Sequence, residues 1–277
     1  MSGVALGLVL FAALLHASWN AMVRGGRDRA LTLAGVASAH AIVGAVFVAI
    51  APLPAPESHP WLITSVLAHY VYYWLLFRAY REGDLSQVYP VSRGMSPALV
   101  TLGAMVLIGE TLSPAGLAGV VLVSSGVGIL ALSGRVRGRA PLWFAVALGV
   151  VIALYSVSDG IGIRASGSLM GYMGWLFLSE ALVTATVLLQ RVKRREAVAP
   201  SALALGMIGG AFSVSAYGIV LYVKTIAPIG AVSAVRESSV IFAALIGVTI
   251  FGERPVGLRL IAAGIVAAGV IALAAGG

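Results

Sequence analysis

The sequence predicts an all-α integral membrane protein of ten transmembrane helices, arranged as two inverted repeats of five helices each. Three observations lead to this prediction. Hydrophobic residues make up 60% of the 277 residues and charged residues only 10%, whereas a soluble domain carries about 25% charged residues. The apolar residues fall into ten long segments, and the second half of the chain resembles the first. The outer surface is therefore expected to face lipid.

Each apolar segment has about the 20 residues that a helix needs to cross the hydrocarbon core. Glycines, prolines and charge clusters separate the segments, which cover 3–23, 31–51, 61–80, 86–108, 114–132, 141–163, 170–190, 201–223, 230–251 and 257–275. Their uninterrupted apolar length excludes barrel strands, which would show about ten residues of alternating character. The chain enters the first segment without a basic region or a small-residue cleavage site, so we expect a span there rather than a signal peptide.

The positions of the basic residues predict the orientation of these spans. Of the 18 lysines and arginines, 14 lie in the odd-numbered loops and only Arg164 and Lys224 in the even-numbered ones. Because cytoplasmic loops carry the excess of positive charge, both termini are expected on the outer side of a bacterial-type inner membrane. The net charge of +8 sits in short clusters between apolar segments, which indicates this orientation rather than a nucleic-acid-binding surface.

The chain also resembles itself, with a first copy in residues 1–134 and a second in 141–277. Shifts of 143 and 139 residues align Arg93 with Arg236, Gly109-Glu110 with Gly252-Glu253, Leu15-His16 with Leu154-Tyr155, and Asn20 with Asp159. Each copy holds an odd number of spans, so the second copy is upside down relative to the first. In transporters, inverted repeats place the substrate site between the two halves, near the middle of the membrane.

Three short motifs resemble those of a known family. They are Gly109-Glu110-Thr111-Leu112, Gly252-Glu253-Arg254-Pro255 and the opening Leu15-His16-Ala17-Ser18-Trp19-Asn20-Ala21. Together with the five-plus-five layout, they resemble the EamA family of the drug/metabolite transporter superfamily, in its ten-helix type, over essentially the whole chain. The resemblance implies a carrier of amino acids, sugars, nucleotide derivatives or cationic drugs. The aromatic residues of segment 61–80 are most similar to the YddG-like exporters of aromatic and other amino acids.

Segment 61–80 is rich in aromatic residues and carries the first candidate site. His69, Tyr72 and Tyr73 share one helix face near the middle of this segment. They are interpreted as a cavity wall, whose rings cover an apolar or aromatic ligand while the hydroxyls and the imidazole bind its polar end. The alternative is packing between helices together with an aromatic belt at the membrane surface, to which Tyr80 is assigned.

Segment 86–108 presents Tyr89 and Arg93 on one face, and prolines at Pro90 and Pro97 predict a kink or hinge. The equivalent segment 230–251 carries the polar residues Ser233, Arg236 and Glu237. Each arginine is either a structural clamp or a ligand for a substrate carboxylate, which a guanidinium binds with two hydrogen bonds. All of these side chains are therefore candidates for a substrate site.

Two further segments carry matching polar faces. Trp19 and Asn20 share a face of segment 3–23 with His16, and the matching face of segment 141–163 carries Tyr155, Ser158 and Asp159. Asp159, Glu180 and Glu237 are the acids well inside spans, so they are the candidates for proton coupling or for binding an amino group. Glu180 is interpreted first as an interhelical hydrogen-bonded contact, and Glu110 and Glu253 as helix caps.

The expected function is that of a secondary carrier which exports small metabolites by alternating access, with amino acids including aromatic ones as the leading substrates. Sugars or flat cationic drugs are the alternative. The four scattered histidines and the absence of cysteine offer no catalytic set for a membrane enzyme, and no filter motif indicates a channel. No cofactor, metal or nucleic acid is expected. The expected partners are the substrate and membrane lipid, with protons as a candidate coupling ion.

Overall fold

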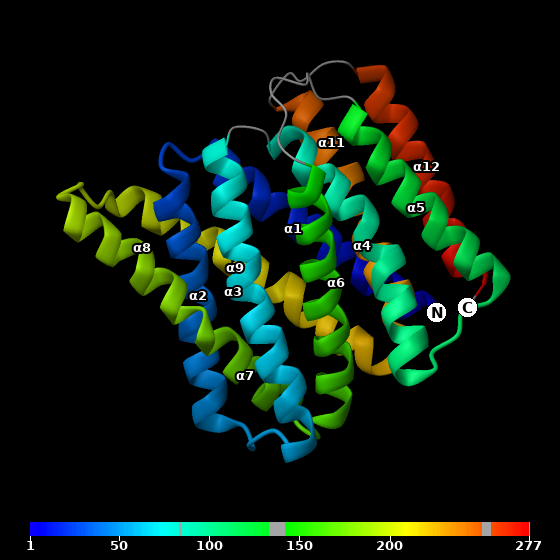
Figure 1. The fold of residues 1–277 in the computed structure, drawn as a ribbon, viewed down its shortest axis with the longest axis horizontal. Coiled ribbons are helices and arrows are strands. Elements are labelled where there is room, and N and C mark those ends of the chain that lie inside the picture. The colour runs from blue at the N-terminus through cyan, green and yellow to red at the C-terminus, as the bar shows by residue number, and fades with distance from the viewer. Residues whose placement is uncertain (83–84, 133–141, 251–255, 277) are drawn as a thin grey trace.

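The computed structural model describes residues 1–82, 85–132, 142–250 and 256–276 (Figure 1). Within these ranges the chain forms twelve α-helices, one short 3-10 turn and no strand. The residues up to 132 form α1 Gly3–Gly25, α2 Arg29–Ile50, η1 Pro56–Ser58, α3 His59–Glu82, α4 Leu85–Ile108 and α5 Pro114–Leu132. The residues from 142 onward form α6 Leu142–Ala165, α7 Leu169–Ser179, α8 Ala181–Arg194, α9 Pro200–Ile226, α10 Ile229–Arg236, α11 Ser239–Thr249 and α12 Val256–Ala275.

Helix length and composition are those of a membrane-spanning protein. In the described ranges, eight helical segments are long and apolar enough to cross a membrane. Large apolar side chains cover the outside of the bundle, such as Val106 at 74% and Ile271 at 68% exposure. A contiguous surface of this kind favours lipid over water. The chain is therefore an all-α, multi-pass membrane protein, while the number of ten crossings stays a prediction.

Two of the predicted segments coincide with two helices each. Segment 170–190 is divided at Glu180, and segment 230–251 at Glu237 and Ser238. At both breaks the backbone tightens to hydrogen bonds between residues three apart, for example from the Glu180 N–H to the Phe177 carbonyl at 3.1 Å. Such a stretch inside a helix often marks a functional hinge. Neither break contains proline, whereas α4 is one continuous helix with Pro97 in its interior.

Glycines allow the helices to approach each other closely. Gly35 of α2 faces Gly206 of α9, and a Cβ atom on either one would collide with the backbone of the other helix. Gly119 of α5 and Gly269 of α12 form a second such contact, where a Cβ would lie within 2.8 Å of the opposite carbonyl oxygen. Small residues at helix contacts are typical of membrane bundles, because packing rather than water exclusion joins the helices.

The two ends of the bundle can be defined by contacts between loops. At one end, the Ala55 N–H donates to the Ser166 carbonyl at 2.8 Å, close to Arg164. At the opposite end, Arg191 forms an ion pair with Asp28 at 2.7 Å. We call these the Arg164 end and the Arg191 end. In Figure 1 the Arg164 end is at the bottom of the helices α2, α3 and α6.

Candidate functional site

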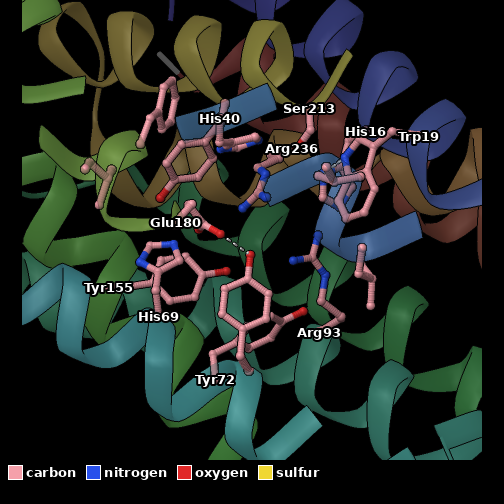
Figure 2. A pocket seen from close by; sticks show the side chains of 16 residues that line it. His16, Trp19, His40, His69, Tyr72, Arg93, Tyr155, Glu180, Ser213 and Arg236 are labelled. Carbon is pink, nitrogen blue, oxygen red and sulfur yellow. Dashed lines mark hydrogen bonds between the residues drawn. The ribbon is translucent and has the colours of Figure 1, made fainter. Parts of the chain in front are cut away.

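A cavity of about 110 Å³ lies inside the bundle, among eight helices and the break at Glu180 (Figure 2). Its lining consists of His16, Trp19, Leu33, Val36, His40, His69, Tyr72, Tyr73, Arg93, Tyr155, Leu176, Phe177, Glu180, Ser213, Tyr217 and Arg236. Seven predicted site residues are thus brought together: Trp19, His69, Tyr72, Tyr73, Arg93, Tyr155 and Arg236. The cavity is smaller than the 300–1,000 Å³ of pockets for drug-sized ligands, so a large ligand requires the walls to move apart.

Aromatic rings from α3 and α6 form one wall of the cavity. The rings of His69 and Tyr155 are stacked, with centroids 4.2 Å apart. Tyr72 meets Tyr155 and Tyr73 edge to face, with centroids 6.1 and 5.7 Å apart. The His69 ring is fixed from its own helix, because its Nδ1 atom lies 2.8 Å from the Ser65 carbonyl oxygen. The predicted face of segment 61–80 therefore does line a cavity, and stacked rings of this kind bind flat or apolar groups.

The break between α7 and α8 is held in place by two tyrosines of α3. The Tyr70 hydroxyl donates to the Ser179 carbonyl at 2.7 Å, and the Tyr73 hydroxyl donates to the Glu180 carboxylate at 2.8 Å. Glu180 is only 8% exposed and lines the cavity. The sequence interpretation of Glu180 as an interhelical contact is therefore incomplete, because this side chain both contacts α3 and faces the cavity.

The two arginines of the cavity differ in their partners. Arg93 of α4 forms a buried ion pair with Glu237, at 2.9 Å. Arg236 at the end of α10 places its guanidinium over the Tyr217 ring, 5.6 Å from the centroid. Although Glu237 follows Arg236 in the sequence, it forms its ion pair with Arg93 of α4, in the other half of the chain. The pair joins α4 to the break between α10 and α11.

The remaining predicted residues whose side chains the structure describes lie outside the cavity lining. Asn20 donates to the His16 carbonyl within its own helix at 2.7 Å, and the Ser233 hydroxyl contacts the Ser156 hydroxyl at 3.1 Å. Ser158 is buried but does not line the cavity, and Glu237 lies behind Arg93. The side chains of Tyr89, Pro90 and Tyr80 lie outside the described residues, so their predicted roles stay predictions.

Asp159 belongs to a buried polar network between the cavity and the Arg164 end. Its carboxylate accepts hydrogen bonds from Tyr172, at 3.1 Å, and from Tyr217. Lys224 is 1% exposed and donates to the carbonyl and hydroxyl oxygens of Ser156, at 2.7 and 2.9 Å. Tyr217 also lines the cavity, so it connects the cavity to this network.

Arg164 and Glu110 close the network at the end of the bundle. The Arg164 guanidinium forms an ion pair with Glu110 at 3.1 Å and donates to the Lys224 and Ala227 carbonyls. Glu110 in turn accepts from the Ile229 N–H at 2.6 Å, at the first residue of α10. Glu110 thus caps a helix, where a carboxylate is favoured by the exposed N–H groups. These contacts tie the ends of α4, α6 and α9 to the start of α10.

Sequence reasoning left several lining residues out of the site. His40 lies in an apolar stretch where no spacing distinguishes it from core residues, whereas Ser213 and Tyr217 share a helix face at a spacing of four, a polar pair that could have indicated the site. His16 was visible through its shared face with Trp19, and the Trp19 indole N–H does donate to His16 at 3.2 Å. Both ring nitrogens of His40 and the Nε2 atom of His16 are buried without a hydrogen-bond partner among the described residues. No cluster of three metal-ligating side chains occurs in the described ranges.

The fold and the cavity define a polytopic helical membrane protein with a buried polar site at its centre. No protein-family model matches the chain, and no curated protein matches it. The chain is similar to a solved structure described as "Crystal structure of protein", with a TM-score of 0.74 and 20% sequence identity. The similarity covers 98% of this chain and 96% of that chain. At this level of identity it concerns the fold alone.

Proposed function

We propose that this protein is a secondary carrier of the EamA family, in the drug/metabolite transporter superfamily, which exports amino acids including aromatic ones by alternating access. The observation that carries the proposal is the central cavity, where aromatic rings, two arginines and Glu180 from both halves of the chain meet inside a membrane-spanning bundle. Charged side chains are costly inside a membrane, so those that face a cavity indicate a substrate or ion pathway.

The packing of the helices supports the proposed inverted repeats. If α1–α5 and α6–α12 are two copies, α1 and α6 are equivalent, and so are α3 and α9. In the structure, α1 packs against α9, and α6 packs against α3. Each contact thus joins the first span of one copy to the third span of the other. A two-fold axis in the membrane plane would relate these two contacts to each other, and carriers with such repeats bind substrate at the interface between the copies.

The proposed carrier is closed towards the Arg164 end. Between the cavity and this end lie Asp159, Tyr172, Leu221 and Lys224, all of which are at most 1% exposed. A carrier needs such a closed side, because substrate must be released to one side at a time, whereas a channel conducts through both ends. The charge bias of the loops favours an orientation with the Arg191 end in the cytoplasm and the Arg164 end outside.

Transport by purified protein in proteoliposomes tests this proposal. Uptake of labelled phenylalanine should saturate with concentration and should be inhibited by other amino acids. Empty liposomes and liposomes with an unrelated membrane protein are the controls. Uptake that rises linearly without saturation would contradict a carrier, and saturable uptake of sugars without amino acids would contradict the substrate class.

Export of flat cationic drugs is the second candidate. Glu180 and the tyrosine rings of α3 favour it, because a cation binds both to a carboxylate and to the face of an aromatic ring. Competition between labelled phenylalanine and an aromatic quaternary ammonium compound distinguishes the two candidates. Tight binding of the cation together with no binding of phenylalanine would favour the drug exporter.

A further inference from the structure

The four charged side chains in and next to the cavity are not all paired. Arg93 and Glu237 neutralise each other. Among the described residues, no opposite charge forms an ion pair with Glu180 or with Arg236. Glu180 receives the Tyr73 hydroxyl, and Arg236 lies over the Tyr217 ring. One negative and one positive side chain therefore face the same cavity, as Figure 2 shows.

Burying the charges of Glu180 and Arg236 costs desolvation free energy, and a ligand that carries the opposite charges would offset this cost. Glu180 is 8% and Arg236 9% exposed, and a charged group at this depth is stable when it is paired and hydrogen-bonded. The cavity also contains the unpartnered ring nitrogens of His16 and His40. A ligand with one positive and one negative group would pair both charges at once, which a purely cationic, anionic or neutral ligand does not.

The helix break favours a cation beside Glu180. Glu180 ends α7 and also begins α8, so the carbonyl end of α7 attracts positive charge while the N–H end of α8 favours the ionised carboxylate. Half-helix ends of this kind bind cations in other transporters. The other two buried carboxylates have more partners among the described residues: Glu237 is paired with Arg93 and Asp159 accepts from two tyrosines, whereas Glu180 accepts from one, Tyr73.

We propose that Glu180 binds the ammonium group of a zwitterionic substrate and that Arg236 binds its carboxylate. This inference deepens the proposed function and rests on it. Tyr73 positions the Glu180 carboxylate. The substrate side chain extends towards the stacked rings of His69 and Tyr155. In this arrangement the Arg93–Glu237 ion pair does not bind the substrate and has a structural role.

Three ligands that share one ring and differ in charge test the assignment. They are phenylalanine, phenethylamine, which has only the ammonium group, and 3-phenylpropanoate, which has only the carboxylate. Glu180→Gln should weaken binding of phenylalanine and phenethylamine about 10- to 100-fold and leave 3-phenylpropanoate unchanged. Arg236→Gln should weaken the binding of phenylalanine and 3-phenylpropanoate by a similar factor. It should leave the affinity for phenethylamine unchanged. The affinity of each compound is measured by its competition with labelled phenylalanine. Where a variant binds phenylalanine too weakly for competition, binding of each compound is measured on its own.

The matched control is Glu57→Gln, which removes an exposed carboxylate in η1, outside the cavity. It should change none of the three affinities. Tyr73→Phe serves as a second variant if Glu180→Gln fails to fold. Because it removes one hydrogen bond to Glu180, this variant should weaken the binding of phenylalanine and phenethylamine about 3- to 10-fold. It should not change the affinity for 3-phenylpropanoate.

The outcomes separate this inference from the proposed function. If the wild-type protein takes up phenylalanine with saturation but Glu180→Gln weakens all three ligands equally, or none, the assignment of Glu180 is overturned while the carrier stands. An equal effect of Arg236→Gln on all three overturns the assignment of Arg236. If wild-type liposomes take up no amino acid, the proposed function itself fails, before any variant is compared.

Discussion

The cavity and the polar network next to it contain the same kinds of residue. They differ in the number of ion pairs and hydrogen bonds that their polar side chains form within the protein. In the network, Asp159 accepts from two tyrosines, Lys224 donates to Ser156, and Arg164 is paired with Glu110. In the cavity, Glu180 and Arg236 have no ion pair among the described residues, and His40 has no hydrogen-bond partner there. A buried charge that the protein satisfies internally closes the bundle. A buried charge that has fewer partners and faces a cavity, such as Glu180 with the single Tyr73 hydrogen bond, can accept a further partner from a ligand.

The largest expected effect concerns two buried carboxylates that differ in this way. Glu237→Gln should lower the free energy of unfolding by about 3–5 kcal/mol, because it leaves the Arg93 charge buried without its partner. Glu180→Gln should leave the stability unchanged or raise it, because it removes a charge that is not paired. Thermal unfolding of both variants in the same detergent measures the difference. Equal losses of stability would remove the distinction between the two regions.

The aromatic wall should contribute the next largest effect. Tyr72→Ala and His69→Ala should each cost about 1–2 kcal/mol of binding free energy, through lost burial and stacking. The half-saturating phenylalanine concentration should therefore rise about 5- to 30-fold. Trp74→Ala is the control on the same helix, because this ring is 54% exposed on the outside of the bundle. Variants of Tyr72 and His69 with unchanged affinity would show that the wall does not contact the substrate.

Opening the sealed side should have a smaller effect. Arg164→Gln removes the ion pair with Glu110, and since Arg164 is partly exposed, the pair contributes modestly. An impermeant thiol reagent added on the Arg164 side should label Leu221→Cys about 2- to 5-fold faster in this background, because Leu221 is fully buried behind the closure. Arg191→Gln, which breaks an ion pair at the opposite end, is the control. Equal labelling in both backgrounds would show that Arg164 does not keep this side closed.

An effect of similar size concerns the predicted hinge of α4, which is proposed to bend as the cavity opens and the Arg164 end closes. Pro90→Ala should slow transport about 2- to 5-fold and leave binding unchanged, because alanine restores a backbone hydrogen bond that proline removes and so stiffens the helix. Pro200→Ala at the start of α9 is the control, since proline at that position costs no hydrogen bond. Equal loss of binding and transport would assign a static role to Pro90.

Segment 141–163 shows how far the sequence predicts a site. Tyr155, Ser158 and Asp159 share one face of this helix, and the whole face was predicted to bind substrate. In the structure this face has two roles. Tyr155 lines the cavity, whereas Asp159 accepts hydrogen bonds from Tyr172 and Tyr217 outside the cavity lining. Residues four apart on a helix are about 6 Å apart along its axis, which is enough to lie on different sides of a small cavity. Periodicity gives the direction of a side chain but not its neighbour.

The sequence by itself determined the class of the protein and the position of its helices. Insertion into a membrane depends on local apolar length, and helix ends depend on local capping residues such as Asp28, whose side chain accepts from the Leu31 N–H. Both are properties of adjacent residues. The predicted segment 114–132 accordingly coincides with α5.

The tertiary structure decided which polar residues form the site. The pairs that distinguish the cavity from the sealed network join residues far apart in the chain, such as Tyr73 with Glu180 and Arg93 with Glu237. The helix breaks at Glu180 and Glu237 likewise carry no proline signal. Whether a buried carboxylate is paired or available depends on which other helix lies next to it, and that is fixed by the packing of the whole bundle.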